Sequence, residues 1–419
     1  MAQSRLQSVV DHLRGATGAT SSGLAKLQVK NPDDVVVTAA FRTPLCKARK
    51  GGYKDTSSDE LLLELFKAAK ANIGIDAGIV GDICVGTVLT ANAPYSARAA
   101  ALTAGFPDNV PVQIINRFCS SGLMAVSTIA NQIRNGEIEV GLAIGYEHMT
   151  ANSDKGSAPL ADEMMAHPVA KDCIQPMGWT SENVAADFQI SRERMDEVAA
   201  MSHQRAEKAQ NEGIFSSEIV PVQAVAKDAN GNKQRVTISQ DDGIRKGTTK
   251  DALGRIRSAF PQWKPSNTTG GNASQITDGG AFVLLMTRRK AEELGVPILA
   301  KHVATSVSGL APRIMGIGPT YAIPAVLKRT GLSIEEVDLF EINEAFASMY
   351  VYCLEKLKLD PSKVNVNGGA IALGHPLGAT GARQVATGLN ALKRRNGKVL
   401  VTSMCIGLGM GAAAVFIAE

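Results

Sequence analysis

The chain is organised around the stretch Val112-Gln113-Ile114-Ile115-Asn116-Arg117-Phe118-Cys119-Ser120-Ser121-Gly122. An apolar run ends there at a single cysteine, and a helical pattern follows over about residues 122–134. A helix N-terminus carries positive partial charge and free N–H groups, which predicts a lowered pKa for a thiol at that point and hence a nucleophile. A buried, inert cysteine is the commoner fate of a lone Cys, so this stretch alone leaves both interpretations open.

Strands and helices alternate on both sides of this stretch. Apolar, β-branched runs predict strands over residues 34–40, 79–89, 112–116 and 140–146. Helical patterns lie between them over residues 61–69 and 95–104, and the first follows a capping box formed by Ser57 and Glu60. This alternation predicts a mostly parallel sheet with helices on its faces.

Residues 149–271 interrupt the alternation. Helical patterns remain over residues 181–188 and 192–210, but residues 227–236 and 246–249 are predicted to be polar loops. Insertions of this kind on an α/β scaffold often carry substrate recognition.

Residues 298–419 repeat the first part of the chain. A helix that ends at Arg134-Asn135-Gly136 and leads into a strand at 140–145 matches a helix that ends at Arg395-Asn396-Gly397 and leads into a strand at 399–404. The match predicts a duplicated fold. In such a pair, a site is expected where the carboxyl ends of the strands of the two sheets approach each other.

The composition is that of a globular protein, with 419 residues, of which 45% are hydrophobic and 20% charged. This length predicts two or three domains. The formal charge of +4 is too small to argue for nucleic acid as a partner. Six cysteines are scattered without a C-x-x-C pair, which predicts reduced thiols. They are Cys46, Cys84, Cys119, Cys173, Cys353 and Cys405.

The first 30 residues are rich in basic residues, with Asp11 as their one acid. Arg5-Leu6, five residues and then His12-Leu13 resemble an N-terminal peroxisomal targeting signal, which an import receptor would bind. A mitochondrial transit peptide is the alternative, because the segment is amphipathic and poor in acids. An ordinary helix end is the third interpretation.

Residues 399–418 carry no charge and are long enough to span a bilayer. The alternating glycines in the middle of this segment predict instead two buried strands, residues 398–404 and 411–417, joined by a turn. No membrane span is therefore expected.

Three C-terminal stretches combine small and reactive residues, and each has an ordinary alternative. Asn343 could be a helix cap, His375 a structural histidine and Cys405 a core residue. The glycines around His375 could form a phosphate loop, but they match neither the dinucleotide fingerprint nor the P-loop. No dinucleotide fingerprint follows the first predicted strand, which argues against a nicotinamide-dependent dehydrogenase. The stretches cover residues 341–347, 367–383 and 404–411.

Together with the Cys119 stretch, these motifs resemble the thiolase family over residues 33–419. The resemblance rests on Asn116–Gly122, residues 270–281, Asn343-Glu344-Ala345-Phe346, Gly374-His375-Pro376 and Cys405-x-Gly-x-Gly-x-Gly. The targeting pattern brings the chain nearest to the peroxisomal 3-ketoacyl-CoA members.

The resemblance implies a five-layered α/β/α/β/α fold, built from two duplicated domains with an inserted loop domain that binds CoA, and a homodimer. The implied divisions are a targeting segment and linker at 1–32, an N-terminal domain at 33–148 and 272–296, the loop domain at 149–271 and a C-terminal domain at 297–419.

The resemblance also implies roles for the reactive residues. His375 would take the proton of Cys119, which would attack the ketone of the substrate. Cys405 would protonate the acetyl-CoA enolate. One oxyanion hole would consist of His375 Nε2 and a water held by Asn343, and another of the backbone N–H groups of Cys119 and Gly407.

Three further residues are implied contacts of CoA. Arg245 would meet the nucleotide and Ser274 the pantetheine, while Met177 would line the tunnel. Many biosynthetic members have a histidine where this chain has Pro176, and Trp179 follows shortly after. Both residues lie where they bear on the preferred acyl length.

The implied activity is thiolytic cleavage of a 3-ketoacyl-CoA by CoA, with CoA as co-substrate and no permanently bound cofactor or metal. The alternatives are a biosynthetic acetoacetyl-CoA thiolase, which runs the same chemistry in reverse, and a non-catalytic lipid carrier. Decarboxylating ketoacyl synthases share the fold but use Cys-His-His, whereas Asn343 and Cys405 stand here at the other two positions.

Overall fold

The computed structural model describes residues 23–419. The predicted targeting pattern, Arg5 to Leu13, lies outside the described residues. The first described element is the short helix α2 (Gly23–Leu27), whose Leu24 and Leu27 pack against an apolar cluster of the C-terminal half.

Ten strands form one mixed sheet in the order β10-β11-β12-β9-β1-β8-β5-β3-β4, with β2 paired to β8. β6 and β7 form a separate hairpin. The strands are β1 (Val35–Arg42), β2 (Cys46–Lys47), β3 (Asp82–Gly86), β4 (Val112–Ile115), β5 (Val140–His148), β6 (Val222–Lys227), β7 (Lys233–Ile238), β8 (Thr277–Thr287), β9 (Ala300–Gly309), β10 (Leu339–Ile342), β11 (Val399–Ile406) and β12 (Met410–Ala418).

The two halves of the sheet have the same topology. The N-terminal half has the order β1-β8-β5-β3-β4, and the C-terminal half has the order β9-β12-β11-β10. A parallel bridge between Phe340 and Val364 takes the place that β4 has in the first half. The halves join where Val36 and Val37 of β1 pair with β9. The predicted duplication is confirmed.

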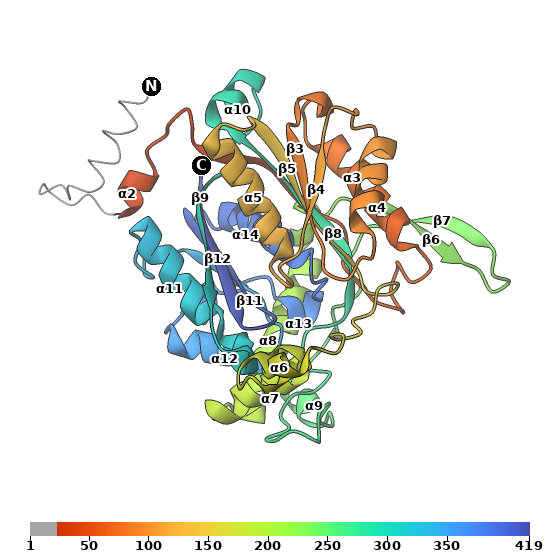
Figure 1. The fold of residues 1–419 in the computed structure, drawn as a ribbon, viewed down its shortest axis with the longest axis vertical. Helices are drawn as coiled ribbons and strands as arrows, with labels where there is room; N and C mark the ends of the chain where they lie inside the picture. The colour runs from red at the N-terminus through yellow and green to blue at the C-terminus, as the bar shows by residue number, and fades with distance from the viewer. Residues whose placement is uncertain (1–22) are drawn as a thin grey trace, which may run out of the picture.

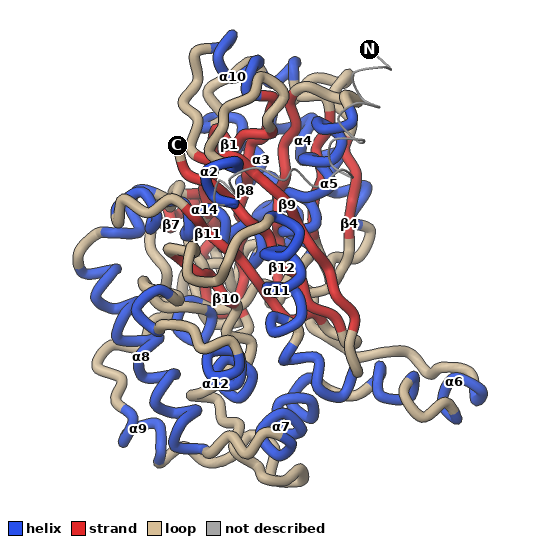
Figure 2. Tube along the Cα trace, turned by 90° about the vertical axis from the view of Figure 1, so that its left-hand side faces the viewer, coloured by secondary structure: helices blue, strands red, loops and turns tan. Residues whose placement is uncertain are grey.

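Helices form three layers around the two halves of the sheet (Figures 1 and 2). The helices α5 and α14 lie in the middle, where they share one apolar cluster with both halves. The helices α3 and α4 cover the outer face of the N-terminal half, and α11 and α12 cover that of the C-terminal half. The five-layered α/β/α/β/α fold is therefore confirmed.

The helices have the following bounds: α3 (Ser58–Asn72), α4 (Ala93–Ala104), α5 (Ser121–Asn135), α6 (Asp162–Ala166), α7 (Met177–Asp187), α8 (Arg192–Asn211), α9 (Lys250–Gly254), α10 (Arg288–Leu294), α11 (Pro319–Thr330), α12 (Ala347–Lys356), α13 (Ala370–Leu373) and α14 (Thr380–Arg394). Short 3₁₀ turns are η1 (Ala77–Ile79), η2 (Ala170–Ile174), η3 (Ile214–Ser217), η4 (Pro312–Ile317) and η5 (Pro361–Lys363).

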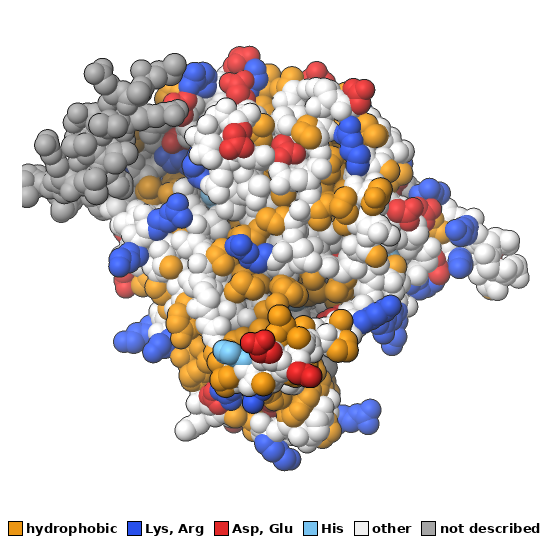
Figure 3. Space-filling view, in the orientation of Figure 1, with side chains coloured by type: hydrophobic (Ala, Val, Ile, Leu, Met, Phe, Trp, Pro, Cys, Tyr) orange, Lys and Arg blue, Asp and Glu red, His pale blue; other side chains and the backbone are white. Residues whose placement is uncertain are grey.

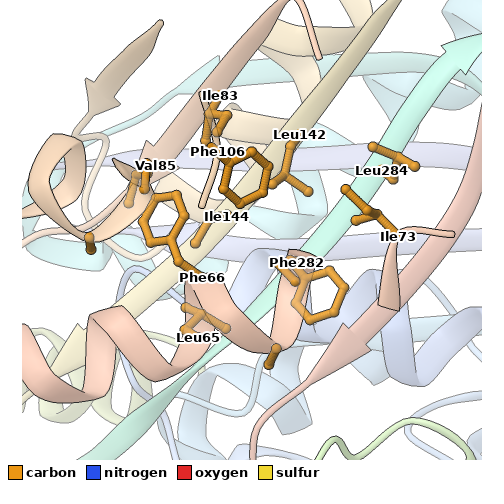
Figure 4. Packing of buried hydrophobic residues seen from close by; sticks show 14 of the residues in the cluster. Leu65, Phe66, Ile73, Ile83, Val85, Phe106, Leu142, Ile144, Phe282 and Leu284 are labelled. Carbon is orange, nitrogen blue, oxygen red and sulfur yellow. The ribbon is translucent and has the colours of Figure 1, made fainter. Parts of the chain in front are cut away.

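The outer core of the N-terminal half shows why α3 forms where the sequence predicts it. Ser57 and Glu60 make the reciprocal bonds of a capping box at its start. Leu65 and Phe66 then face the sheet, and Phe66 meets Phe106 edge to face at a centroid distance of 6.0 Å (Figure 4). Burying each such side chain contributes about 1.5–3 kcal/mol.

The prediction of a mostly parallel sheet is wrong. Only β3–β4, β3–β5 and β10–β11 are parallel among the described pairs of the main sheet. The strands β8 and β12 run antiparallel to their neighbours. β12 follows β11 after a tight turn, and β8 follows β5 after the inserted segment, which leaves and re-enters the sheet at the same end, where His148 pairs with Asp278. The alternation of strands and helices in the sequence indicates only the parallel pairs that are connected through a helix, and it does not reveal the antiparallel pairs.

Two local predictions are also corrected. Residues 227–236, predicted as loop, form most of the β6–β7 hairpin, whose residues are polar because β7 faces solvent. The strand predicted over 79–89 contains only residues 82–86, since η1 precedes it and residues 87–89 leave the sheet to bind a side chain of β5.

Residues 149–271 hold α6 to α9 and the β6–β7 hairpin, and α6 projects from the body (Figure 2). The domain boundaries implied by the family resemblance stay a prediction. Residues 399–418 form the strands β11 and β12, as predicted. Across residues 23–419, no helix has the length and apolar character needed to cross a bilayer.

Candidate active site

Cys119 lies in the turn between β4 and α5. Phe118, just before it, has a φ of 45°, which costs a residue with a side chain roughly 1–3 kcal/mol. The turn is held by its own polar atoms, since Asn116 Oδ1 accepts from the N–H of Phe118 at 3.0 Å and Ser121 Oγ accepts from that of Arg117 at 2.9 Å. The thiol is therefore presented half-buried at the start of α5.

His375 lies buried in the loop between α13 and α14. Its Nδ1 is 2.6 Å from Thr380 Oγ1, and that hydroxyl also lies 3.1 Å from the carbonyl of Pro376. An amide Nδ2 can only donate, and that of Asn343 lies against Nε2, so Nε2 accepts and His375 Nδ1–H donates to Thr380. This assignment leaves Nε2 unprotonated and able to act as a base.

Asn343 follows β10 and meets this free nitrogen. Its Nδ2 lies 3.3 Å from His375 Nε2, while its Oδ1 is buried with no hydrogen-bond partner within residues 23–419. The neighbouring Glu344 fixes the turn by accepting from Ser202 Oγ at 2.6 Å, Asn365 Nδ2 at 2.8 Å and the N–H of Ile371 at 3.1 Å.

Cys405 lies near the carboxyl end of β11 and is fully buried. Its cluster includes Met315, Met349 and Cys353, with Met177 packed against it. The Cys405 thiol donates to Met349 Sδ at 3.3 Å. Burial, with Cys119 nearby, raises the pKa of Cys405 well above its ordinary value, so Cys405 holds a proton that it can donate.

The turn after Cys405 reaches Cys119. The backbone N–H of Gly407 acts on the Cys119 sulfur together with the N–H of Cys119 itself. A Cβ built at Gly407 would lie 3.6 Å from the Phe118 ring and 3.9 Å from Met177 Sδ. The structure thus brings Cys119, Gly407 and Cys405 together, and it joins His375 to Asn343.

The lowered pKa predicted for Cys119 is wrong. Burial raises the pKa of Cys119 to about 11, although the two backbone N–H groups act in the opposite direction. Burial also lowers the pKa of His375 to about 3, with Arg383 adding to the effect. The resting pair is therefore a neutral thiol and a neutral imidazole, because the site withholds water from both charged forms.

The three implied CoA contacts lie in different surroundings. Ser274 donates its N–H to the carbonyl of Ala345 at 3.0 Å, which places it beside the Asn343 turn. Met177 begins α7 and packs on the Cys405 cluster. Arg245 is exposed and donates to the carbonyl of Gly270 at 3.1 Å rather than to a catalytic turn.

Several residues of the site carried no role in the sequence analysis. Thr380 holds Nδ1 of His375, and the backbone carbonyl of Gln275 accepts the backbone N–H of His375 at 3.0 Å. Glu147, fully buried on β5, binds both the loop after β3 and the His375 loop. In the sequence, Glu147 could have been found only as a single charged residue directly after a predicted buried strand.

Models of two protein domains match the chain. The thiolase N-terminal domain matches residues 35–289, and the thiolase C-terminal domain matches residues 296–418. The chain belongs to the thiolase family.

Individual thiolases are similar over nearly the whole chain. The peroxisomal 3-ketoacyl-CoA thiolase of Homo sapiens is 49% identical over 419 residues, which cover 98% of either chain. The crystal structure of the dimeric peroxisomal thiolase of Saccharomyces cerevisiae has a TM-score of 0.86 and 45% identity, and the match covers 94% of this chain and 100% of that one. Human mitochondrial 3-ketoacyl-CoA thiolase in complex with CoA has a TM-score of 0.80 and 36% identity, covering 92% and 98%.

These matches confirm the family resemblance inferred from the motifs. This thiolase has, within residues 23–419, no group of three or more His, Cys, Asp or Glu side chains placed to hold a metal ion. The arrangement offers two thiols, a neutral imidazole and a pair of backbone N–H groups, which suits acyl transfer through a covalent thioester.

Proposed function

We propose that this thiolase cleaves a 3-ketoacyl-CoA with CoA, giving acetyl-CoA and a shortened acyl-CoA, the last step of fatty-acid β-oxidation. The observation that carries the proposal is a division between two thiols. Cys119 is half-buried at a helix start with two N–H groups on its sulfur and can be acylated, whereas Cys405 is fully buried among apolar and sulfur-containing side chains and only exchanges a proton.

In the first half-reaction, Cys119 gives its proton to His375 Nε2 and attacks the ketone carbon. The resulting oxyanion is bound by the N–H groups of Cys119 and Gly407. The bond between the α and β carbons then breaks, which leaves an acyl-Cys119 and the enolate of acetyl-CoA. That enolate is stabilised by protonated His375 and a water held by Asn343, and Cys405 protonates its carbon.

In the second half-reaction, a new CoA enters after acetyl-CoA has left. Its thiol gives a proton to the Cys405 thiolate and attacks the acyl-Cys119 thioester. The oxyanion uses the same pair of N–H groups, and its collapse expels the Cys119 thiolate, which regains its proton from His375. The cycle leaves every group of the enzyme as it began.

CoA is a co-substrate in this scheme, and no cofactor is bound permanently. Arg245 contacts the nucleotide, Ser274 the pantetheine arm and Met177 the wall of the tunnel. The support is positional: Ser274 and Met177 flank the catalytic turns, and Arg245 is an exposed cation of the inserted segment, which suits a phosphate.

The active form is a homodimer. The edge strand β4, which carries the chain to Cys119, has β3 as its one neighbour in the described sheet, and all four of its residues are half-buried. The exposed apolar side chains include Tyr95 of α4, Met164 of α6 and Val169 just before η2. Hydrophobic side chains gather on the face of the molecule shown in Figure 3. An unpaired edge beside apolar side chains suits association with a second copy.

The enzyme acts in the peroxisome, with Arg5-Leu6 and His12-Leu13 as the signal for its import receptor. Removing residues 1–15 is expected to leave the turnover number nearly unchanged, while the protein stays in the cytosol of a cell that has peroxisomes. Import of the full chain into mitochondria would contradict the peroxisomal signal and support a transit peptide.

The acyl intermediate is tested by incubation with a 3-ketoacyl-CoA without free CoA, followed by mass mapping. We expect the acyl increment on Cys119. An increment on Cys353 or Cys405 with Cys119 unmodified would overturn the assignment, and no acylation at all would favour the lipid-carrier alternative. Rates in the cleaving and condensing directions, measured on one preparation, distinguish β-oxidation from acetoacetyl-CoA synthesis.

A further inference from the structure

Glu147 is a buried carboxylate whose partners all belong to loops at the active site. It lies near the carboxyl end of β5, is fully buried and forms no ion pair with a Lys or Arg of residues 23–419. A buried carboxylate without a cation is costly unless several donors satisfy its oxygens.

Four donors satisfy it. Oε1 accepts from the N–H of Leu89 at 3.0 Å and from Thr87 Oγ1 at 3.2 Å. Oε2 accepts from the N–H groups of Val88 and Gly378, both at 3.0 Å. Three of the four are backbone groups, so the carboxylate fixes main chain rather than flexible side chains.

The donors of loop 87–89 connect Glu147 to the turn that carries the nucleophile, Cys119. The N–H of Thr87 donates to the carbonyl of Ile115 at 3.2 Å, and the carbonyl of Val88 accepts from Asn116 Nδ2 at 3.2 Å. Asn116 Oδ1 in turn accepts from the N–H of Phe118, the residue next to Cys119. Loop 87–89 therefore supports the turn that presents Cys119.

The fourth donor, Gly378, connects Glu147 to the loop that carries the base, His375. Gly378 lies three residues after His375, and its backbone rests directly on the strand ends, where a Cβ would come within 2.5 Å of Tyr146 O and 2.6 Å of Thr87 Cα. Glu147 is the one residue of the described chain that accepts from both loop 87–89 and the His375 loop.

We propose that Glu147 is a positioning residue whose carboxylate ties the turn that carries Cys119 to the loop that carries His375. It touches neither substrate nor the reacting atoms and acts through the two loops. The inference rests on the roles proposed for Cys119 and His375.

The charge of Glu147 provides a second, separable effect. A carboxylate near Cys119 opposes a thiolate, and Glu147 contributes to the raised pKa of the Cys119 thiol. Removing the charge alone should therefore lower the pKa of the Cys119 thiol. Removing the contacts between the carboxylate and the two loops should lower turnover. A residue that only stabilises the fold would not produce the first effect.

Two variants separate charge from reach. Glu147→Gln keeps the size and removes the charge, and it places an amide N–H₂ against N–H donors. Glu147→Asp keeps the charge on a side chain about 1.5 Å shorter, which cannot reach both loops. The control is Glu182→Gln, because Glu182 is equally buried and accepts from the N–H groups of Asn267 and Thr268, away from both catalytic turns.

The measurements are thiolysis turnover and the rate of iodoacetamide alkylation at Cys119 at one fixed pH, with the thermal melt as a check of folding. Both Glu147 variants should lose roughly 10²-fold in turnover, the effect of about 1 Å of misplacement. Only Glu147→Gln should raise the alkylation rate at that pH, because a lower Cys119 pKa gives more thiolate, and Glu182→Gln should leave the rate unchanged.

An unchanged turnover or an unchanged alkylation rate in Glu147→Gln would overturn the inference. If that variant does not fold, Glu147→Asp decides, since turnover equal to that of the unmodified enzyme would overturn it. Failure of the proposed function looks different: the unmodified protein itself would then show neither turnover nor acylation of Cys119.

Discussion

The two halves of the sheet place different chemistry at the same structural position. Glu147 lies two residues beyond Gly145, the last residue of β5 that pairs with β3, and Cys405 lies two residues beyond Ser403, the last residue of β11 that pairs with β10. One position thus holds a carboxylate that binds loops, and the other holds a thiol that exchanges a proton.

The surroundings explain the difference. Backbone N–H groups converge on the position in the N-terminal half, which satisfies a carboxylate. Apolar and sulfur-containing side chains surround the position in the C-terminal half, which keeps a thiol protonated. A duplicated scaffold therefore supplies equivalent positions, and the packing around each one decides whether it supports or reacts.

The comparison predicts that the nucleophile comes from the N-terminal half alone. Cys119→Ala should abolish thiolysis and acylation, because no other described thiol lies at a turn between a strand and a helix N-terminus with N–H groups on its sulfur. The matched control is Cys84→Ala, since Cys84 is a buried thiol on the adjacent strand β3. Turnover by the Cys119 variant would show that the halves do not divide the chemistry in this way.

The second prediction concerns the thiol of the C-terminal half. Cys405→Ser should lower turnover by about 10²–10⁴-fold, because a serine hydroxyl is far less acidic and general acid–base help is typically worth that much. Iodoacetamide should still react with Cys119 at the normal rate in this variant, but more slowly in His375→Ala. If both variants slowed alkylation equally, Cys405 would belong to the activation of the nucleophile.

The third prediction uses the pKa values of the pair. A thiol becomes more reactive when it loses its proton, and the Cys119 pKa of about 11 lies above the accessible range. Alkylation of the free enzyme should therefore rise about tenfold per pH unit between about pH 6 and pH 9 without a plateau. His375, with a pKa of about 3, adds no step in this range. A plateau near neutrality would reveal a thiolate–imidazolium pair instead.

The smallest expected effect concerns the contact between the halves. Gly378→Ala should lower the free energy of unfolding by about 1–3 kcal/mol, because the new methyl group meets backbone atoms that cannot move aside. Gly309→Ala on β9 is the control, as its Cβ would meet nothing within 4 Å, and it should change stability by less than about 0.5 kcal/mol. Denaturant unfolding measures both, and equal values would mean that the strand ends can separate.

Local physics in the sequence determined much of this protein. The capping box at Ser57, the turn signals after α5 and α14, and the strand that delivers Cys119 are interactions between near neighbours, which a sequence displays directly. The family motifs then indicated His375, Asn343 and Cys405, and the structure joins Asn343 to His375 and places Cys405 at a strand end near Cys119.

Only the tertiary structure decided the strand directions, the supports of the site and the sign of the Cys119 pKa shift. Glu147 accepts from Thr87, 60 residues away, and from Gly378, 231 residues away, so no local pattern announces the contact. The helix N-terminus favours a thiolate at Cys119, but burial by segments distant in the sequence outweighs it. Desolvation depends on everything that surrounds a group, and for that reason the sequence identified the nucleophile while the folded chain set its charge.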